Sequence, residues 1–203
     1  MEHNEVAVTC SNKTVQFLSI RDRCIKVTRT VTTKHRCDGV AAIGRYEIVV
    51  SGPADDLKKC YWSIVSRKTG ETCFYAFDYL YTHVTRVALN RTNTRVYISG
   101  FGSGEVFCFG LTNGKHYFIY SSKNLTDPYG IAVDREDNVY IVGNRSQNIH
   151  KLSPDGTTLQ IITAGVPHDP KIISFDKSQE RLILINGSVE NVESYTCLTK
   201  SRI

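Results

Sequence analysis

The sequence lacks any long hydrophobic run and has few of the residues that favour helices. Its 203 residues include one Met, against 11 Tyr and many Val, Ile and Thr. Branched and aromatic side chains suit the pleated surface of a sheet, so we expect strands and little helix. No window holds 18 consecutive apolar residues, and the polar, acidic start MEHNEVAVTC differs from a secretion signal. We therefore expect neither membrane insertion nor a retained signal peptide.

A cysteine pattern for metal binding or for a disulfide framework is also missing. The seven Cys are odd in number and contain no C-x-x-C pair, and most lie inside apolar runs, where a thiol acts as a small hydrophobic group. A reducing compartment fits best, so we expect a cytoplasmic protein. Five Asn-x-Ser/Thr triplets instead favour a secreted protein, and they begin at Asn12, Asn90, Asn124, Asn144 and Asn186. We prefer to explain them as turns, which use Asn, Ser and Thr for local hydrogen bonds, because the start of the sequence differs from a signal segment.

Charge is nearly balanced except in the first third. Residues 1–70 carry 12 Lys or Arg against 7 Asp or Glu, whereas residues 71–203 carry 13 of each. Two interpretations of this basic third remain open: an ordinary solvated surface, or a surface that attracts an acidic partner.

The sequence does contain a repeat, with a period near 43 residues. The apolar runs EVAVTC, EIVVSG, RVYISG, NVYIVG and RLILIN each end in a small residue, at Cys10, Gly52, Gly100, Gly143 and Asn186. Turn glycines keep the same phase, in KTG, TNG and PDG, at Gly70, Gly114 and Gly156. Glycine supplies the positive φ that short turns between strands need, so these positions predict strands joined as hairpins.

One repeat holds four predicted strands, here called a, b, c and d. In the repeat at residues 127–169 they cover residues 131–133, 139–142, 149–152 and 159–163. Runs such as VYIV are apolar at every position, as expected for a sheet that is covered on both faces. A period of about 40 to 45 residues with four strands is typical of a β-propeller blade. A β-sandwich is the alternative, but it would expose one face of each strand.

We therefore predict one all-β domain, a β-propeller of about five four-stranded blades. The approximate blades are residues 1–35, 36–82, 83–126, 127–169 and 170–203. Three are complete and two are partial, because the first predicted strand (Glu5 to Cys10) is a b strand and the last (Val192 to Leu198) is a c strand.

The best-defined repeat also points to a family. It contains PYGIAVD at residues 128–134, NVY at 138–140, Ile149, Leu152 and PDG at 154–156. These residues, in this order, resemble the NHL repeat, a propeller module of tripartite-motif (TRIM) proteins. The family's Asp after strand b and Arg before strand c are replaced here by Gly143 and Asn148. A family site built on that charge pair is therefore not expected.

The resemblance implies a substrate-recruiting role beside a ubiquitin ligase, or binding of single-stranded RNA, which some members of the family perform. No RING or B-box pattern of Cys and His is present, so we expect no ligase activity from this chain. The family usually closes six blades. We therefore expect a truncated member, a five-bladed ring, or an open ring completed by a partner. Unpaired strand edges in an open ring would favour self-association.

No catalytic constellation stands out in the sequence. The six His have no metal-ligand spacing, and no nucleophile lies beside a recognisable base and acid. Gly100 to Gly104, GFGSG, is similar to a phosphate-binding loop, but such a loop needs a helix after it, so a turn between strands b and c explains it better. We expect no metal, no cofactor and no enzymatic activity. A propeller lyase or lactonase is the less favoured alternative.

Binding remains as the function, and the d–a and b–c loops of a propeller emerge on one face. The candidate contact residues in those loops are Lys34, His35, Arg36, His83, Phe101, Tyr129, Arg145 and His168. A basic surface with exposed aromatics can accept a peptide, or attract the phosphates and stack the bases of RNA. We predict a protein partner first and single-stranded RNA as the alternative, with no membrane partner.

Overall fold

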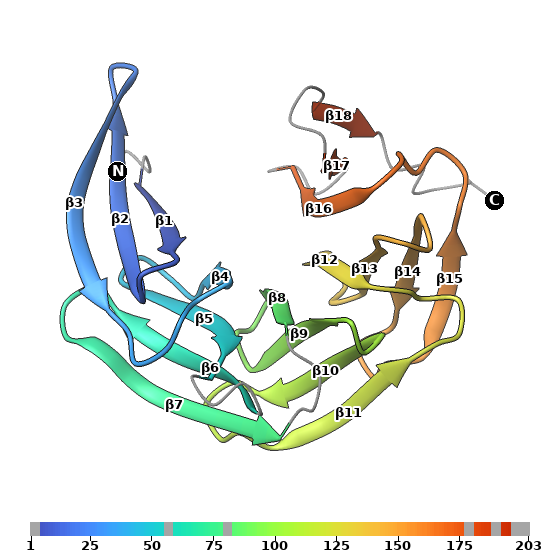
Figure 1. The fold of residues 1–203 in the computed structure, drawn as a ribbon, viewed down its shortest axis with the longest axis horizontal. Coiled ribbons are helices and arrows are strands. Elements are labelled where there is room, and N and C mark those ends of the chain that lie inside the picture. The colour runs from blue at the N-terminus through green and yellow to red at the C-terminus, as the bar shows by residue number, and fades with distance from the viewer. Residues whose placement is uncertain (1–4, 55–58, 79–82, 177–180, 188–191, 196–203) are drawn as a thin grey trace. The chain divides into compact units, whose positions relative to one another are not determined.

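The computed structural model describes residues 5–54, 59–78, 83–176, 181–187 and 192–195. Every regular element in these ranges is a β-strand, and the strands form five antiparallel sheets (Figure 1). Among these residues, no helix that could span a membrane is found. Contacts divide the chain into two compact units, Met1–Val87 and Ala88–Ile203, and each is described by itself.

The first unit contains two sheets, which we call A and B. Sheet A has three strands, β1 (Glu5–Cys10), β2 (Thr14–Arg21) and β3 (Cys24–Thr32). Sheet B has four strands, β4 (Gly39–Ala42), β5 (Glu47–Pro53), β6 (Lys59–Ser66) and β7 (Gly70–Asp78). The turn into β7 uses Gly70 at a φ of 90°, the positive value that the KTG signal predicts.

The second unit contains most of sheet C and all of sheets D and E. Sheet C begins with β8 (His83–Leu89), which spans the boundary, and continues with β9 (Arg95–Phe101), β10 (Glu105–Gly110) and β11 (His116–Ser121). Sheet D consists of β12 (Pro128–Val133), β13 (Val139–Gly143), β14 (Asn148–Leu152) and β15 (Thr158–Ile162). Sheet E consists of β16 (Pro170–Phe175), β17 (Leu182–Asn186) and β18 (Val192–Tyr195).

The pairing of strands confirms the predicted repeat. In sheets B, C and D, four consecutive strands pair in chain order as a, b, c and d. Within the described residues, sheet A holds strands b, c and d, and sheet E holds strands a, b and c. Strand d of sheet D, β15, begins and ends one residue earlier than the sequence predicts. The last predicted strand is described only as far as Tyr195.

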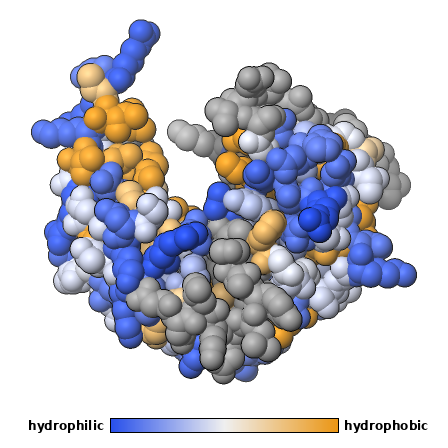
Figure 2. Space-filling model, in the orientation of Figure 1, coloured by the Kyte–Doolittle hydropathy of each residue, from blue (hydrophilic) through white to orange (hydrophobic). Residues whose placement is uncertain are grey.

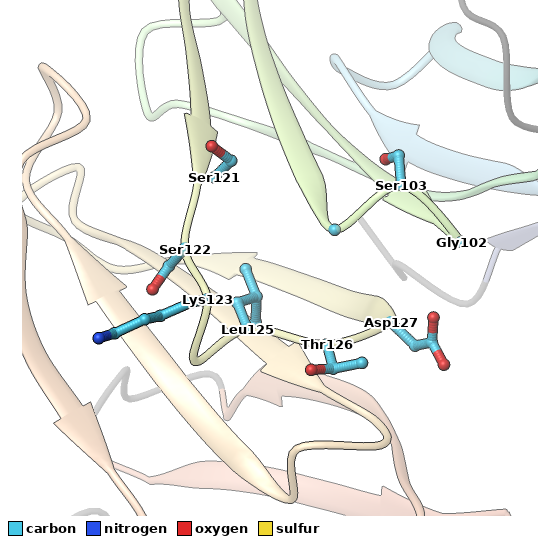
Figure 3. Close-up of a pocket in the computed structure, with 9 residues that line it drawn as sticks. Gly102, Ser103, Ser121, Ser122, Lys123, Leu125, Thr126 and Asp127 are labelled. Atoms are coloured by element: carbon cyan, nitrogen blue, oxygen red, sulfur yellow. The ribbon is translucent and has the colours of Figure 1, made fainter.

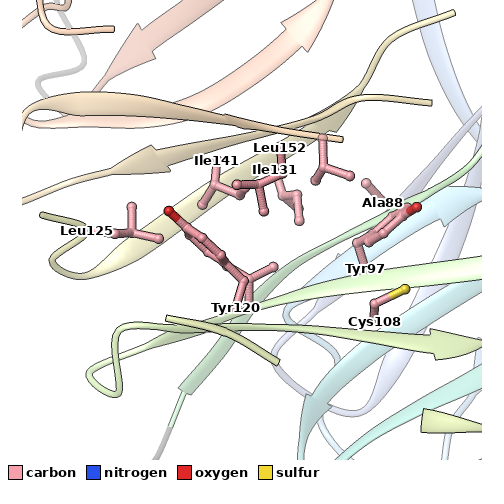
Figure 4. Close-up of a cluster of buried hydrophobic side chains, with 10 residues drawn as sticks. Ala88, Tyr97, Cys108, Tyr120, Leu125, Ile131, Ile141 and Leu152 are labelled. Carbon is pink, nitrogen blue, oxygen red and sulfur yellow. The ribbon is translucent and has the colours of Figure 1, made fainter. Parts of the chain in front are cut away.

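Both faces of sheet D are covered, which explains why the run VYIV shows no alternation. Val139 and Ile141 belong to a cluster shared with sheet C (Figure 4). Tyr140 and Val142 belong to a cluster shared with sheet E. All four side chains are at most 1% exposed. Each aliphatic side chain gains roughly 1.5–3 kcal/mol by leaving water. A sandwich, with one wet face for each sheet, does not describe this arrangement.

Sheets A and B of the first unit share a core of the same kind. Its buried residues are Val15, Phe17 and Val31 from sheet A, Cys37 from the connecting loop, and Ile48, Val50, Tyr61 and Val65 from sheet B. Only one face of sheet A contributes to this cluster. The opposite face of sheet A carries exposed apolar side chains.

Two glycines let the first strands of neighbouring sheets approach each other closely. A Cβ at Gly130 in β12 would lie 2.7 Å from the backbone oxygen of Lys171 and 3.0 Å from the backbone nitrogen of Ile173, both in β16. A Cβ at Gly39 in β4 would lie 3.0 Å from the backbone nitrogen of Val87 in β8. Backbone atoms cannot swing aside as a flexible side chain can, so glycine is required at both positions.

We expect Gly130→Ala to lower the free energy of unfolding by about 1–3 kcal/mol, because the added methyl group forces β12 away from β16. Gly44→Ala is the matched control, since nothing lies within 4 Å of a Cβ at Gly44. Urea titrations of both variants measure the difference. An equal effect of the two substitutions would contradict the close approach.

Candidate functional site

In the second unit, each d–a loop meets the b–c turn of the sheet that follows it. Asp127 and Asp169 end the two loops with left-handed φ values of 53° and 52°. The backbone carbonyl of Asp127 accepts a hydrogen bond from the backbone N–H of Asn144 (3.0 Å), and that of Asp169 accepts one from Gly187 (2.9 Å). The two kinds of loop therefore lie together at one end of the strands, as the sequence predicts for a propeller.

Side chains extend this link from sheet D to sheet E. The Asn144 amide donates hydrogen bonds to the Asp169 carboxylate (2.6 Å) and to the carbonyl of Pro170 (3.1 Å). The Asn144 bond, together with Lys171, lowers the pKa of Asp169 below its ordinary value. The amide rather than a charged pair is the main cause, so the link should depend little on salt.

Three of the predicted contact residues are tied to this loop cluster by direct interactions. The Phe101 and Tyr129 rings meet edge to face with centroids 5.8 Å apart. Arg145 is 78% exposed and lies 3.5 Å from the Asp127 carboxylate. Exposed pairs of this kind contribute little to stability. Because the pair is weak and the side chain is exposed, the Arg145 guanidinium is accessible to a ligand. His168 is exposed and directly precedes Asp169. We call Phe101, Tyr129, Arg145 and His168 the loop surface.

A cavity of about 450 Å³ lies beside the loop surface (Figure 3). It is lined by Gly102, Ser103, Gly104, Ser121, Ser122, Lys123, Leu125, Thr126 and Asp127. Hydroxyl and backbone groups dominate this lining, and the Lys123 side chain extends away from the Gly102–Ser103 turn in Figure 3. The cavity is therefore suited to neutral hydrogen-bonding groups, such as a peptide backbone, more than to a phosphate.

The GFGSG segment forms one wall of this cavity as a turn between β9 and β10. Gly102 and Gly104 adopt φ values of 93° and 74°, which favour glycine. The Ser103 hydroxyl donates to the carbonyl of Gly100 (3.1 Å) and accepts from the backbone N–H of Glu105 (3.1 Å). A strand and not a helix follows, so the b–c turn interpretation is confirmed and the phosphate-loop interpretation is wrong.

The first unit groups the basic candidates around two aromatic rings. The Lys34 ammonium lies 4.7 Å from the centroid of the Phe74 ring. The His35 ring lies 5.4 Å from Phe74 and 5.3 Å from Tyr61. Arg36 is paired with Asp38 at 2.9 Å, which raises the pKa of its guanidinium. We call Lys34, His35, Arg36 and Phe74 the basic cluster.

Buried groups hold the loop that carries the basic cluster. The Tyr61 hydroxyl lies within 3.1 Å of the carbonyls of His35 and Arg36 and 3.2 Å from the Cys37 thiol. A Cβ at Gly52 would lie 2.1 Å from the Arg36 carbonyl, so this loop packs directly against β5. Burial raises the pKa of the Cys37 thiol. The thiol stays protonated at neutral pH and is not an activated nucleophile.

One predicted contact residue lies partly outside the described structure. His83 begins β8, but its side chain is outside the described residues. Sequence reasoning also missed Asp127, Asn144 and Asp169, which hold the loop surface together. A signal was present for two of them, because an Asp-Pro pair marks the start of strand a at residues 127–128 and 169–170.

Neutral residues occupy the two positions at which the NHL repeat pattern has an Asp and an Arg. Gly143 and Asn148 are direct partners across the b–c turn. The Asn148 amide donates to the carbonyl of Asn124 (2.7 Å), and its oxygen accepts from the Ser146 hydroxyl (2.8 Å). A Cβ at Gly143 would lie 2.5 Å from that oxygen. The pair therefore secures the d–a loop and leaves no charge unpaired.

Reactive and metal-binding groups are scarce in the described ranges. The six cysteines described there are free thiols, and burial raises the pKa of Cys108 to about 12. The described residues contain no group of three or more His, Cys, Asp or Glu side chains that could hold a metal ion. The described loops carry hydrogen-bonding groups, a guanidinium and aromatic edges. These groups are suited to binding a ligand.

His150 in β14 is fully buried and bonded at both ring nitrogens. Its Nδ1 lies 2.6 Å from the Tyr120 hydroxyl, and its Nε2 lies 3.2 Å from the carbonyl of Asn124. The Thr158 hydroxyl donates to the Tyr120 oxygen, so the Tyr120 O–H donates to Nδ1 and the Nε2–H donates to the carbonyl. Burial lowers the pKa of His150, which keeps the imidazole neutral. His150 thus joins β11 and its loop to sheet D.

Acid should weaken the fold through His150. Because its pKa is lowered in the folded state, the unfolded chain takes up the proton first, and stability is lost as the pH falls from about 6.5 toward that lower value. In His150→Gln, which cannot titrate, the urea midpoint should fall less between about pH 7.5 and 5.5. The same fall in both proteins would show that His150 is not the responsible group.

Comparison with known proteins agrees with this architecture. A family model described as a β-propeller repeat matches residues 113–144, which include all of β11, β12 and β13. The solved β-propeller domain of Myceliophteria thermophila Cps50 (Swd1) is similar, with a TM-score of 0.69 and 9% identity over 96% of this chain and 67% of that chain. No curated protein sequence matches. The chain therefore has the β-propeller fold, while the resemblance to NHL repeats stays a prediction.

Proposed function

We propose that this chain is a non-enzymatic interaction module that binds a protein partner through the loop surface. The observation that carries the proposal is the contiguity of exposed Arg145, the Phe101–Tyr129 pair and the polar cavity at one end of sheets C and D. Aromatic and Arg side chains are the usual anchors of protein interfaces. A polar cavity beside them can accept the backbone of a bound segment.

Preorganisation supports the same proposal. The loops that carry these residues are fixed by backbone bonds at Asn144 and Gly187 and by the Asn144 amide. A surface that is already ordered loses little conformational entropy on binding. β-propellers in general serve as interaction scaffolds, which agrees with a binding role.

The finer proposal is recruitment of a substrate to a ubiquitin ligase by an NHL-like propeller in the cytoplasm. It rests on the motif at residues 128–156, which resembles the NHL repeat, and on the thiols, which suit a reducing compartment. The chain would contribute recognition alone, because no RING or B-box pattern is present in its 203 residues.

The loop surface can be tested with a double variant and a matched control. Phe101→Ala with Arg145→Ala removes an aromatic side chain and a cation from the loop surface. Tyr117→Ala with Lys115→Ala removes the same chemistry from exposed positions at the c–d connection of sheet C. Quantitative cross-linking in cell extract should recover one or more proteins with wild type and with the control. The amount recovered with the loop variant should be lower by roughly tenfold. Identical recovery with all three proteins would refute the loop surface.

Single-stranded RNA is the second candidate, and the basic cluster favours it. Phe74 is 37% exposed beside the Lys34 ammonium and the His35 ring, which combines a stacking platform with a cation. Base stacking on such a side chain contributes about 1–3 kcal/mol per base.

RNA binding through the basic cluster predicts a steep salt dependence. A fluorescein-labelled oligouridine should bind wild type with an affinity that falls as salt rises, because phosphate contacts release counterions. Lys34→Ala with Arg36→Ala should weaken binding and flatten that slope, whereas the loop variant above should leave both unchanged. Affinity that does not respond to salt would eliminate this candidate.

A further inference from the structure

Sheet A has a continuous apolar face that is open to solvent. Five of its large apolar side chains are 37–68% exposed: Val6, Val8, Ile20, Ile25 and Val27. The strand register places Val6 beside Leu18, and Leu18 beside Val27. It also places Ile20 directly opposite Ile25. The residues therefore form one patch (Figure 2, over the strands labelled β1–β3 in Figure 1), which is larger than the scattered exposure normal for a surface.

The repeat shows what kind of surface belongs on this patch. We call the side of a sheet toward the preceding sheet its near face and the side toward the following sheet its far face. The far face of sheet A packs on sheet B, the far face of sheet C on sheet D, and the far face of sheet D on sheet E. Each of these contacts is made by aliphatic and aromatic side chains of two sheets. The open patch is the near face of sheet A, so its matching surface is the far face of another sheet.

Sheet E offers such a far face. Ile173 and Leu184 point to sheet D, whereas Ile172, Ile183 and Ile185 alternate with them and point to the other side. Ile172 lies opposite Ile185 in the register, so the three isoleucines form a second aliphatic patch. Ile172 is 39% exposed, and Ile183 and Ile185 are half-buried.

Charge favours contact between these two faces over contact between two copies of sheet A. Residues 5–32, which form sheet A, carry five Lys or Arg against two Asp or Glu. In the register Lys26 and Arg29 lie on the far face with Phe17, so the positive charge of sheet A acts on an approaching molecule at long range and repels a second copy of sheet A. Residues 170–195, which include sheet E, carry three Lys or Arg against four Asp or Glu. Opposite net charges steer the two faces toward each other.

We propose that the far face of sheet E in one copy of the chain binds the near face of sheet A in a second copy. The contact continues the repeat from one molecule into the next, with the same sheet-on-sheet packing found inside each unit. It is heterologous, so copies join head to tail into a ring or a filament. This surface is separate from the loop surface and does not depend on the proposed function.

Two variants block the two faces separately. Ile25→Glu with Val27→Glu places charge on the near face of sheet A, and Ile172→Glu places charge on the far face of sheet E. Size-exclusion chromatography with light scattering should give wild type a mass of at least two chains of 22.8 kDa. Each variant alone should be monomeric, because a buried unpaired charge weakens the contact by roughly 100-fold or more. An equimolar mixture should recover dimers, since each variant supplies the face that the other has lost.

The control is Ile119→Glu, which changes a side chain of similar exposure (51%) on β11, outside both faces, and should keep the wild-type mass. Circular dichroism and melting of every variant separate loss of association from loss of folding. Wild type that stays monomeric at all concentrations would overturn the proposal. So would an Ile172→Glu protein that remains dimeric, which would indicate pairing of sheet A with itself. A mixture that remains monomeric would also overturn it, because the contact would then lie within one chain or with another protein.

Discussion

The burial of both faces of each inner sheet is the constraint on which the rest of the structure depends. A strand covered on one side alternates between apolar and polar residues, but β5, β9 and β13 are buried at nearly every position. Covering both sides requires another layer on each side, as sheets C and E provide for sheet D, which explains why the chain repeats one four-stranded unit. It also explains why glycine lies where the first strands of neighbouring sheets approach each other.

The same constraint moves chemistry out of the sheets and into their connections. Three polar side chains inside the sheets, Ser99, Asn148 and His150, form hydrogen bonds with neighbouring loops or strands. They are already satisfied and act by holding the loops in place. The accessible groups, such as exposed Arg145 and half-buried Phe101, stand on a scaffold that is fixed beneath them. Such a molecule is suited to recognise a partner by shape and surface chemistry.

The sequence predicts the strands better than it predicts the site. Period, turn glycines and uninterrupted apolar runs are local signals, and they were enough to locate strands a to d and the three-stranded end sheets. Tyr120 and His150 are 30 positions apart. Their hydrogen bond depends on which side of each strand faces the next sheet and on how far along the two strands the side chains lie. Periodicity carries no information on this relative position along the strands. For the same reason, Asn144 could be assigned to a turn but not to its bond with Asp169.

Within each unit, sheets that follow one another in the sequence also pack on one another in space, which affects how such a chain can change over evolutionary time. In the second unit, sheet D packs on the sheet before it and the sheet after it, so a new repeat can be added at an end without rebuilding existing cores. The terminal sheets are where the chain can lengthen or shorten by a whole module. Substitutions that adapt a newly acquired module would accumulate at such a junction, while the inner sheets keep their original residues.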